Sequence, residues 1–214
     1  MVNVVLLGSP GSGKGTMARM LWEKHGVSHI STGDLLRQEI LNETDIGKQI
    51  APILSSGKLV DNSIVSRVLT KAVKNAKSGF VLDGFPRNSE QVRILEKILR
   101  ETKQKIDFVI ELNATDKKVV ERLSSRRQCP KCGKVYGFNA PPKKEGLCDN
   151  DHEKLFQRED DKSSVILERL KIYHRETLPL LAYFKDKAIV KSVDADKSIN
   201  QVFKDVSKIL FKGK

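Results

Sequence analysis

The sequence is poor in aromatic residues, in cysteine and in long hydrophobic runs, and each shortage argues against a class of protein. Aromatic residues make up 6% of the 214 positions, so the stacking surfaces that nucleic-acid-binding modules need are scarce. Three cysteines cannot all pair, which argues against a secreted disulfide scaffold and favours a reducing cytoplasm. Near the start, the longest uncharged apolar run covers only residues 4–7. We therefore expect neither a transmembrane helix nor a signal peptide.

Positive charge is in clear excess, with 39 Lys and Arg against 27 Asp and Glu, a formal net charge of +12. Such a surface suits polyanions: nucleic acid, a membrane or phosphorylated small molecules. Most of the excess is lysine scattered singly, so a solvated surface without a specific partner is an equal alternative. Apolar residues make up 39% of the chain and recur in tight groups, which favours a globular domain over disorder.

Short apolar runs alternate with segments of helical spacing. Strands are expected at residues 2–7, around Ile30, and at 80–82, 108–110 and 189–193. Helices are expected at 14–25, 35–41 and 46–54, after Asp61, after Asn88 or Ser89, from Thr115 to Arg126, from Ser163 with a break at Pro179, and after a cap at Asp196. This alternation predicts an α/β fold with a five-stranded parallel sheet covered by helices.

Two segments interrupt the alternation. Residues 32–60 hold two helical patterns where one would suffice, and residues 127–161 hold all three cysteines with several Pro and Gly. A connection as long as the second segment is normally disordered or functional, and its cysteines favour function.

Residues 8–14, Gly-Ser-Pro-Gly-Ser-Gly-Lys, match the pattern G-x-x-x-x-G-K between the first strand and the first helix. Glycines let successive backbone N–H groups point at phosphate oxygens, and the following helix adds its positive end. Lys14 would reach the outer phosphates of a donor nucleotide, and Thr16 is the nearest hydroxyl for a metal-bound phosphate. The alternative is an ordinary glycine-rich turn, but both flanks fit a P-loop NTPase fold.

The long insertion contains Cys129-x-x-Cys132 and, after fifteen intervening residues, Cys148-x-x-Asp151. Two knuckles of this spacing predict a tetrahedral metal site, and three thiolates with one carboxylate suit zinc. His152 is the rival fourth ligand. A chance C-x-x-C is the other alternative, and a redox motif is disfavoured because it should open a helix after a strand.

Further motifs give a family resemblance. They are Gly8-x-Pro10-Gly11-x-Gly13-Lys14-Gly15-Thr16, Ser31-Thr32-Gly33-Asp34-x-x-Arg37, Asp83-Gly84-Phe85-Pro86-Arg87, Arg122-x-x-x-Arg126-Arg127, Arg158-x-Asp160-Asp161 and Arg169. Together they resemble the adenylate kinases, a branch of the nucleoside monophosphate kinases, in the bacterial form with a long zinc-binding lid. The resemblance extends over nearly the whole chain.

The resemblance implies reversible phosphoryl transfer from MgATP to AMP, giving two ADP, in a cytoplasmic monomer with no specific nucleic-acid or membrane partner. It implies a core at residues 1–31, 61–125 and 162–214, an AMP-binding insertion at 32–60 and a zinc lid at 126–161. For ATP it implies Gly11, Ser12, Gly13, Lys14, Gly15, Thr16, Arg126, Val135, Tyr136 and Lys197. For AMP it implies Thr32, Arg37, Lys58, Leu59, Val60, Gly84, Phe85, Pro86, Arg87, Gln91, Arg158 and Arg169. The residues acting on the transferring group would be Lys14, Arg87, Arg122, Arg126, Arg158 and Arg169.

Physical reasoning about the residues points the same way. Asp83 follows a strand at the edge where open parallel sheets bind ligands, and could hold Mg²⁺ through water. Arg122 and Arg126 share a helix face, and Asp160 and Asp161 could hold the arginines in place. An acceptor that is already a phosphate oxygen needs no general base, so positioned cations suffice. The four histidines match no catalytic pattern and are interpreted as surface or packing residues.

Two rival functions remain. The same fold could act on UMP or CMP, although an amide at Gln91 can read an adenine edge and favours AMP. A zinc-knuckle nucleic-acid-binding protein would use the net charge, but it leaves the segment at residues 83–87 unexplained.

Overall fold

The computed structural model describes residues 2–76, 78–187 and 189–211. Its central sheet is parallel, with strand order β2-β3-β1-β4-β7. The strands are β1 (Val2–Leu7), β2 (Ser28–Ser31), β3 (Gly79–Asp83), β4 (Phe108–Asn113) and β7 (Val190–Asp194). The predicted α/β fold with a five-stranded parallel sheet is therefore confirmed.

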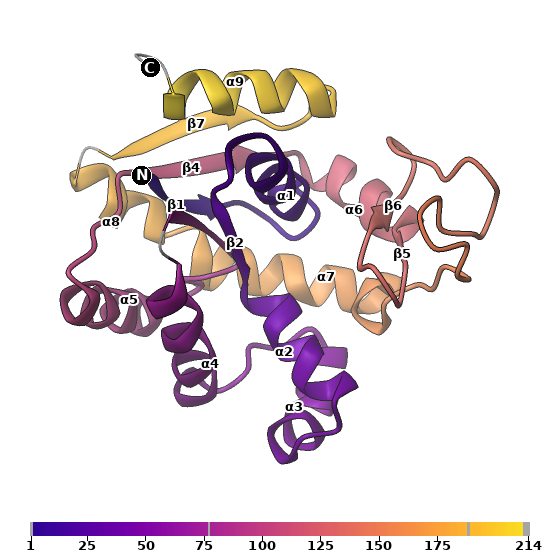
Figure 1. Ribbon diagram of the computed structural model, residues 1–214, viewed down its shortest axis with the longest axis horizontal. Coiled ribbons are helices and arrows are strands. Elements are labelled where there is room, and N and C mark those ends of the chain that lie inside the picture. The colour runs from indigo at the N-terminus through magenta and orange to yellow at the C-terminus, as the bar shows by residue number, and fades with distance from the viewer. Residues whose placement is uncertain (1, 77, 188, 212–214) are drawn as a thin grey trace.

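Helices cover both faces of this sheet (Figure 1). Helices α1 (Lys14–His25) and α9 (Ile199–Phe211) pack on one face, and α4 (Asn62–Asn75), α5 (Ser89–Thr102) and α8 (Leu180–Asp186) pack on the other. Strand β1 serves both cores, because Val5 and Leu7 join one apolar cluster and Val4 and Leu6 join the other. This explains why the strand reads as one continuous apolar run.

The segment at residues 32–60 contains α2 (Thr32–Leu41) and α3 (Asp45–Ser55). Ser31 caps α2 by accepting the N–H of Asp34, and Thr44 caps α3 by accepting the N–H of Gly47. These two helices extend beyond the sheet at the end where α2 leaves β2 (Figure 1).

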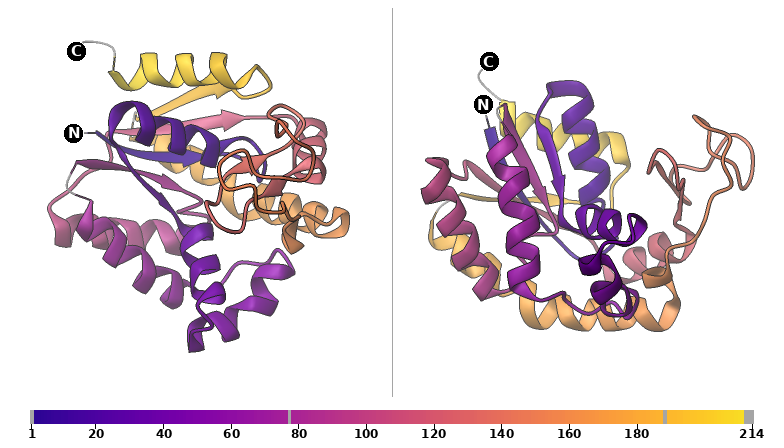
Figure 2. Two further views of the ribbon diagram at one scale, coloured as in Figure 1. Left: turned by 45° about the vertical axis from the view of Figure 1, so that its right-hand side comes forward. Right: turned by 60° about the horizontal axis from the view of Figure 1, so that its bottom comes forward.

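The cysteine-containing segment leaves the core between α6 (Asp116–Ser125) and α7 (Ser163–Ile172). It contains the antiparallel pair β5 (Arg127–Gln128) and β6 (Val135–Tyr136), and returns through a 3-10 turn at Glu159–Asp161. Figure 2 shows its loops projecting from the body of the molecule. Val119 and Leu123 of α6 pack against Ile166 and Leu170 of α7, so the two ends of the segment are held together by a small apolar cluster.

Helix boundaries test the expected caps. Asp61 and Asn88 cap α4 and α5 as predicted, and the chain passes through a π-helical turn at Tyr173–Thr177 before Pro179. The helix predicted from Thr115 to Arg126 is shorter: Thr115 is its cap, α6 ends at Ser125, and Arg126 is extended, so Arg122 and Arg126 do not share a helix face. The cap predicted at Asp196 is wrong. Its carboxylate accepts the backbone N–H of Thr115, while the Ser198 hydroxyl accepts the N–H of Gln201 at the start of α9.

Among the described residues, no helix combines the length and apolarity needed to cross a bilayer.

Candidate active site and metal centre

A cavity of about 640 Å³ opens where the carboxyl ends of β1 and β3 meet the cysteine-containing segment. Its lining includes most of the residues expected to bind nucleotides. They are Gly11, Ser12, Gly13, Lys14, Gly15, Thr16, Arg37, Lys58, Leu59, Asp83, Gly84, Pro86, Arg87, Arg122, Arg126, Val135, Tyr136, Arg158, Arg169 and Lys197. These residues come from distant parts of the chain, so the fold gathers them into one site.

The glycine-rich loop curls between β1 and α1. Gly8 has φ +149°, and a Cβ there would lie 2.6 Å from the carbonyl oxygen of Leu112. The Lys14 ammonium donates to the carbonyl oxygens of Gly8 and Ser9, both at 2.8 Å. The loop is thus closed around its own lysine, with backbone N–H groups at the start of α1 facing the cavity, as phosphate binding requires.

Lys14 lies in a crowded field of positive charge. The pKa of its ammonium is lowered to about 8, mainly by burial and also by the charges of Arg87, Arg169 and Arg126, which together outweigh the opposing effect of Asp83. A cluster of buried cations with few counterions is costly in a low-dielectric site. A bound polyphosphate would supply the compensating negative charge.

Asp83 ends β3 directly beside the loop. A Cβ on Gly15 would lie 3.2 Å from Asp83 Oδ2, so the small residue at position 15 gives the carboxylate access to the first turn of α1. Nε2 of His29 lies 3.4 Å from the same oxygen. Burial opposes ionisation of Asp83, but the hydrogen bond with His29 and the charge of Lys14 outweigh it, so the pKa is lowered.

From the sequence, His29 is interpreted as a surface or packing residue, whereas the structure places it in the cavity wall against Asp83. The pairing of β2 with β3, which sets His29 opposite Val81, brings the two side chains together. No local sequence pattern predicts this contact between His29 and Asp83, which are 54 residues apart in the chain.

Arg87 follows the segment at residues 83–86 and is fixed at several points. Its Nε donates to the Gly84 carbonyl oxygen at 2.8 Å, and its own carbonyl oxygen accepts the Thr177 hydroxyl at 2.8 Å. Burial lowers the pKa of the guanidinium to about 10, with a further contribution from Arg169. Within the described part of the chain its Nη atoms have no hydrogen-bond or ion-pair partner, so they can grip a phosphate in a fork.

Two arginines share one aspartate at the base of the cysteine-containing segment. Arg126 donates to Asp161 from Nε at 2.7 Å and from Nη2 at 2.5 Å, and Arg169 Nη1 donates to Asp161 at 3.0 Å. Arg169 also forms an ion pair with Asp160 at 3.0 Å. Of the four arginines that Asp160 and Asp161 were expected to hold, these aspartates bind two, Arg126 and Arg169.

Arg158 connects the same region to α2. Its Nε donates to Gln128 Oε1 at 2.6 Å, and its Nη2 lies 3.7 Å from Asp34 Oδ1. Asp34 also accepts from Arg37 at 2.6 Å. Burial lowers the pKa of Arg158 to about 9, with Arg126 and Arg37 adding to the effect. Arg37, Arg87 and Arg158 thus line the same cavity as the glycine-rich loop.

Four expected AMP residues, namely Thr32, Val60, Phe85 and Gln91, do not line this cavity. The Thr32 hydroxyl donates to the Gly84 carbonyl oxygen at 2.9 Å. Gln91 is 2% exposed, and both ends of its amide are engaged: Oε1 accepts the Arg87 N–H at 2.8 Å, and Nε2 donates to Asn62 at 2.9 Å. In this conformation Gln91 positions Arg87.

Arg122 and Lys197 also line the cavity. Arg122 Nη2 donates to the Ala195 carbonyl oxygen at 2.7 Å, which ties α6 to the loop after β7. Lys197 pairs with Asp205 at 3.0 Å. A flat base could stack on the guanidinium of Arg122 in this region.

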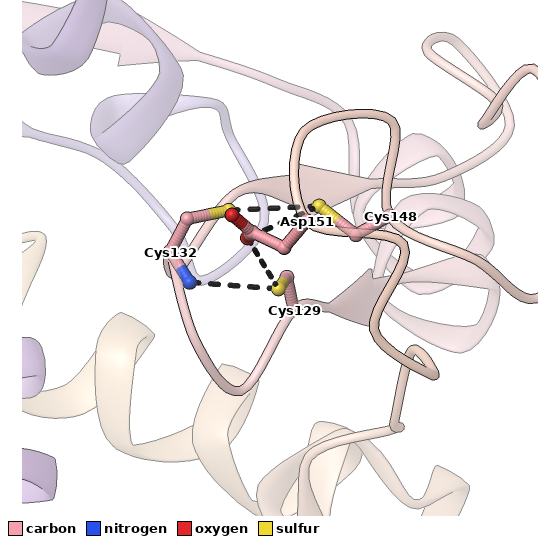
Figure 3. Close-up of side chains that lie close together, drawn as sticks. All are labelled: Cys129, Cys132, Cys148 and Asp151. Carbon is pink, nitrogen blue, oxygen red and sulfur yellow. Dashed lines mark hydrogen bonds between the residues drawn. The ribbon is translucent and has the colours of Figure 1, made fainter.

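The four predicted metal ligands converge in one cluster (Figure 3). The ligand atoms of Cys129, Cys132, Cys148 and Asp151 all lie within 4.8 Å of one another. Sγ of Cys132 lies 3.6 Å from Sγ of Cys148, which is in turn 3.6 Å from Asp151 Oδ2. Sulfurs about 2.3 Å from a zinc ion at tetrahedral angles would be about 3.8 Å apart, so the cluster fits a four-coordinate ion and could hold a metal.

His152, the rival ligand, is absent from this cluster. Its backbone N–H donates to the Cys148 carbonyl oxygen at 2.9 Å, and its φ is +57°.

Burial opposes ionisation of the Cys148 thiol, but hydrogen bonds from the Tyr136 hydroxyl and the Asn150 N–H outweigh it and lower the pKa to about 7.

The parallel sheet, the phosphate loop and the arginine-lined cavity together define a P-loop nucleotide phosphotransferase. The adenylate kinase family model matches residues 6–189. The adenylate kinase of Methanothrix thermoacetophila is 44% identical over 99% of both chains. That of Caldicellulosiruptor saccharolyticus is 41% identical over 98% of this chain and 99% of its own, and that of Archaeoglobus fulgidus is 39% identical over 99% of both. The chain therefore belongs to the adenylate kinase family.

Proposed function

We propose that this chain catalyses reversible phosphoryl transfer from MgATP to AMP, giving two ADP, within the cavity between β1, β3 and the lid (residues 126–161). Its membership of the adenylate kinase family supports this reaction. The observation that carries the proposal is the convergence of Lys14, Arg87 and Arg169 on one buried site. The charge of Arg169 is close enough to lower the pKa of Lys14.

The residues would divide the work by position. Gly11 to Thr16 would hold the donor phosphates through backbone N–H groups, with Arg122, Val135 and Lys197 toward the adenosine. Arg37, Arg87 and Arg158 would grip the phosphate of AMP. Charge that spreads over the transferring group would be stabilised by Lys14 and by the arginines, including Arg126 and Arg169. Asp83 would hold Mg²⁺ through water, and the ion would neutralise charge on the phosphates when bound.

Gln91 is proposed to read the adenine of AMP. For this it would turn its amide away from Asn62 while keeping the carbonyl contact with Arg87. Thr32, Lys58 to Val60, and Gly84 to Pro86 would complete the walls of the AMP pocket. Residues 32–60 and the lid would move relative to the core at residues 1–31, 61–125 and 162–214 as the nucleotides bind.

The metal in the lid is proposed to be a structural zinc ion. Three thiolates and one carboxylate form a donor set typical of zinc, and four protein ligands leave no open position for substrate. We expect EDTA to lower the melting temperature, because a metal that binds only the folded lid stabilises it. Elemental analysis should give one zinc per chain. A protein purified without chelator that holds well under one metal ion would contradict the proposal.

We also propose a cytoplasmic monomer. The family resemblance implies a monomer, and thiols gathered for a metal suit a reducing compartment.

A coupled assay with ATP and AMP tests the reaction, with UMP, CMP and GMP as competing acceptors. The decisive variant is Lys14→Met, which we expect to lower turnover at least ~100-fold. Lys24→Met, on an exposed position of the same helix, is the matched control and should retain turnover. Equal rates for the two variants, or equal rates with UMP and AMP, would contradict the proposed function.

A further inference from the structure

We propose that Tyr136 is a positioning residue of the metal site, whose hydroxyl donates a hydrogen bond to the sulfur of Cys148 and thereby strengthens metal binding. The inference rests on the proposed metal centre in the lid. Both residues of β6 line the nucleotide cavity, and Tyr136 has the further task of supporting the metal ligands.

The two side chains of β6 lie on opposite faces, as successive residues of a strand do. Val135 is 37% exposed and Tyr136 is 3% exposed. Tyr136 belongs to a small buried cluster with Cys129, Cys148 and Leu155. Its ring therefore forms part of the packed interior of the lid, next to two of the metal ligands.

The hydrogen bonds of the Tyr136 hydroxyl fix the direction of its proton. The backbone N–H of Asp149 donates to the hydroxyl oxygen at 2.8 Å. A phenol has one hydrogen to donate, and Sγ of Cys148 lies 3.3 Å from the oxygen. The hydroxyl therefore accepts from the backbone, and it donates to the sulfur when Cys148 is a metal-bound thiolate, because a thiolate has no proton to donate.

Cys148 Sγ receives a second hydrogen bond, from the backbone N–H of Asn150 at 3.4 Å. Two donors on one thiolate would disperse its negative charge and hold it in orientation toward the ion. Groups that orient metal ligands in this way contribute strongly to affinity, and their loss typically costs 10–100-fold.

The Tyr136 ring is itself held in place. Lys134 Nζ lies 5.0 Å from the ring centroid and 3.3 Å from Asp149 Oδ2. Asp149 Oδ1 accepts the N–H of Lys143 at 2.8 Å. Tyr136, Lys134 and Asp149 thus form one connected unit that joins the first knuckle to the second.

The test is Tyr136→Phe, which removes the hydroxyl and keeps the ring. In a competition titration with a chelator, we expect the dissociation constant for zinc to be about 10-fold or more higher in Tyr136→Phe than in the wild type. Tyr183→Phe is the matched control. Tyr183 lies in α8, outside the lid, and its hydroxyl donates to Glu96 and not to a metal ligand. With Co²⁺ as the probe, we expect the thiolate-to-cobalt charge-transfer band of Tyr136→Phe to shift to lower energy.

Melting with and without EDTA separates this role from simple packing. The loss of stability in Tyr136→Phe should appear in the metal-loaded protein and disappear in the chelated protein. Equal losses in both states, or a zinc affinity equal to that of the wild type, would overturn the inference while leaving the metal centre in place. A wild type that binds neither Zn²⁺ nor Co²⁺ would overturn the metal centre and this inference with it.

Discussion

Replacing Asp161 with asparagine should destabilise the protein more than any surface change in the same turn. The Asp161 side chain is fully buried and accepts three N–H groups, two from Arg126 and one from Arg169. An asparagine of the same shape carries no charge and presents an NH₂ group to guanidinium donors. Arg169 keeps Asp160 as a partner, whereas Arg126 loses its ion-pair partner.

Breaking a buried ion pair by removing one partner costs about 3–5 kcal/mol. For a chain of this length, each kcal/mol lowers the melting temperature by about 2–4 °C. We therefore expect Asp161→Asn to melt roughly 6–20 °C below the wild type. Glu159→Gln, in the same 3-10 turn, loses an exposed pair with Lys162, and should cost less than about 1 kcal/mol.

The assay is thermal unfolding of both variants, followed by circular dichroism, with and without AMP and a non-hydrolysable ATP analogue. Because phosphates would supply negative charge to Arg126 and Arg169, the bound nucleotides should narrow the gap between Asp161→Asn and the wild type. If Asp161→Asn melts within the same few degrees as Glu159→Gln, the buried pair does not stabilise the base of the lid. If the difference in melting temperature between Asp161→Asn and the wild type is the same with and without nucleotides, Arg126 and Arg169 do not bind the phosphates.

Three further predictions concern the acceptor and the metal. Arg87→Ala should lower turnover at least ~100-fold, because a buried phosphate contact is lost. Arg67→Ala, on the exposed face of α4, is the control and should not lower turnover. Near-normal turnover of Arg87→Ala would refute the role of Arg87 in binding phosphate. Gln91→Leu should reduce the preference for AMP over UMP by about 1–3 kcal/mol, or about 5–150-fold, because a buried amide no longer discriminates; steady-state kinetics with both acceptors decides this. Asp151→Asn should weaken zinc retention and His152→Ala should not, as metal analysis after dialysis would show.

The sequence predicted best those features whose cause is local. Loop curvature at residues 8–14 follows from glycine, and the caps at Asp61 and Asn88 follow from short polar side chains before apolar helical patterns. The metal cluster was predictable because knuckle spacing alone limits the geometry. These patterns involve residues within one turn or one loop of each other.

Several features that depend on packing between distant segments were not predicted. Asp196 is of a residue type that commonly caps helices. Its carboxylate instead accepts the backbone N–H of Thr115, 81 residues earlier in the chain. The contact of His29 with Asp83 exists because β2 pairs with β3 in a particular register. Tyr136 and Val135 are neighbours in the sequence, and only the β5–β6 pairing decides which of them is buried.

The small apolar cluster between α6 and α7 has a consequence for chain entropy. Because Leu123 packs against α7, the lid begins and ends at two points that the core already holds together. The entropic cost of such a loop rises only slowly with its length, by about 0.6 kcal/mol for each doubling. The loops of the lid before the 3-10 turn at Glu159–Asp161 can therefore lengthen or shorten at little entropic cost to the folding of the sheet. A metal cluster can then be acquired or lost within the lid as a self-contained unit, while the cavity floor stays unchanged.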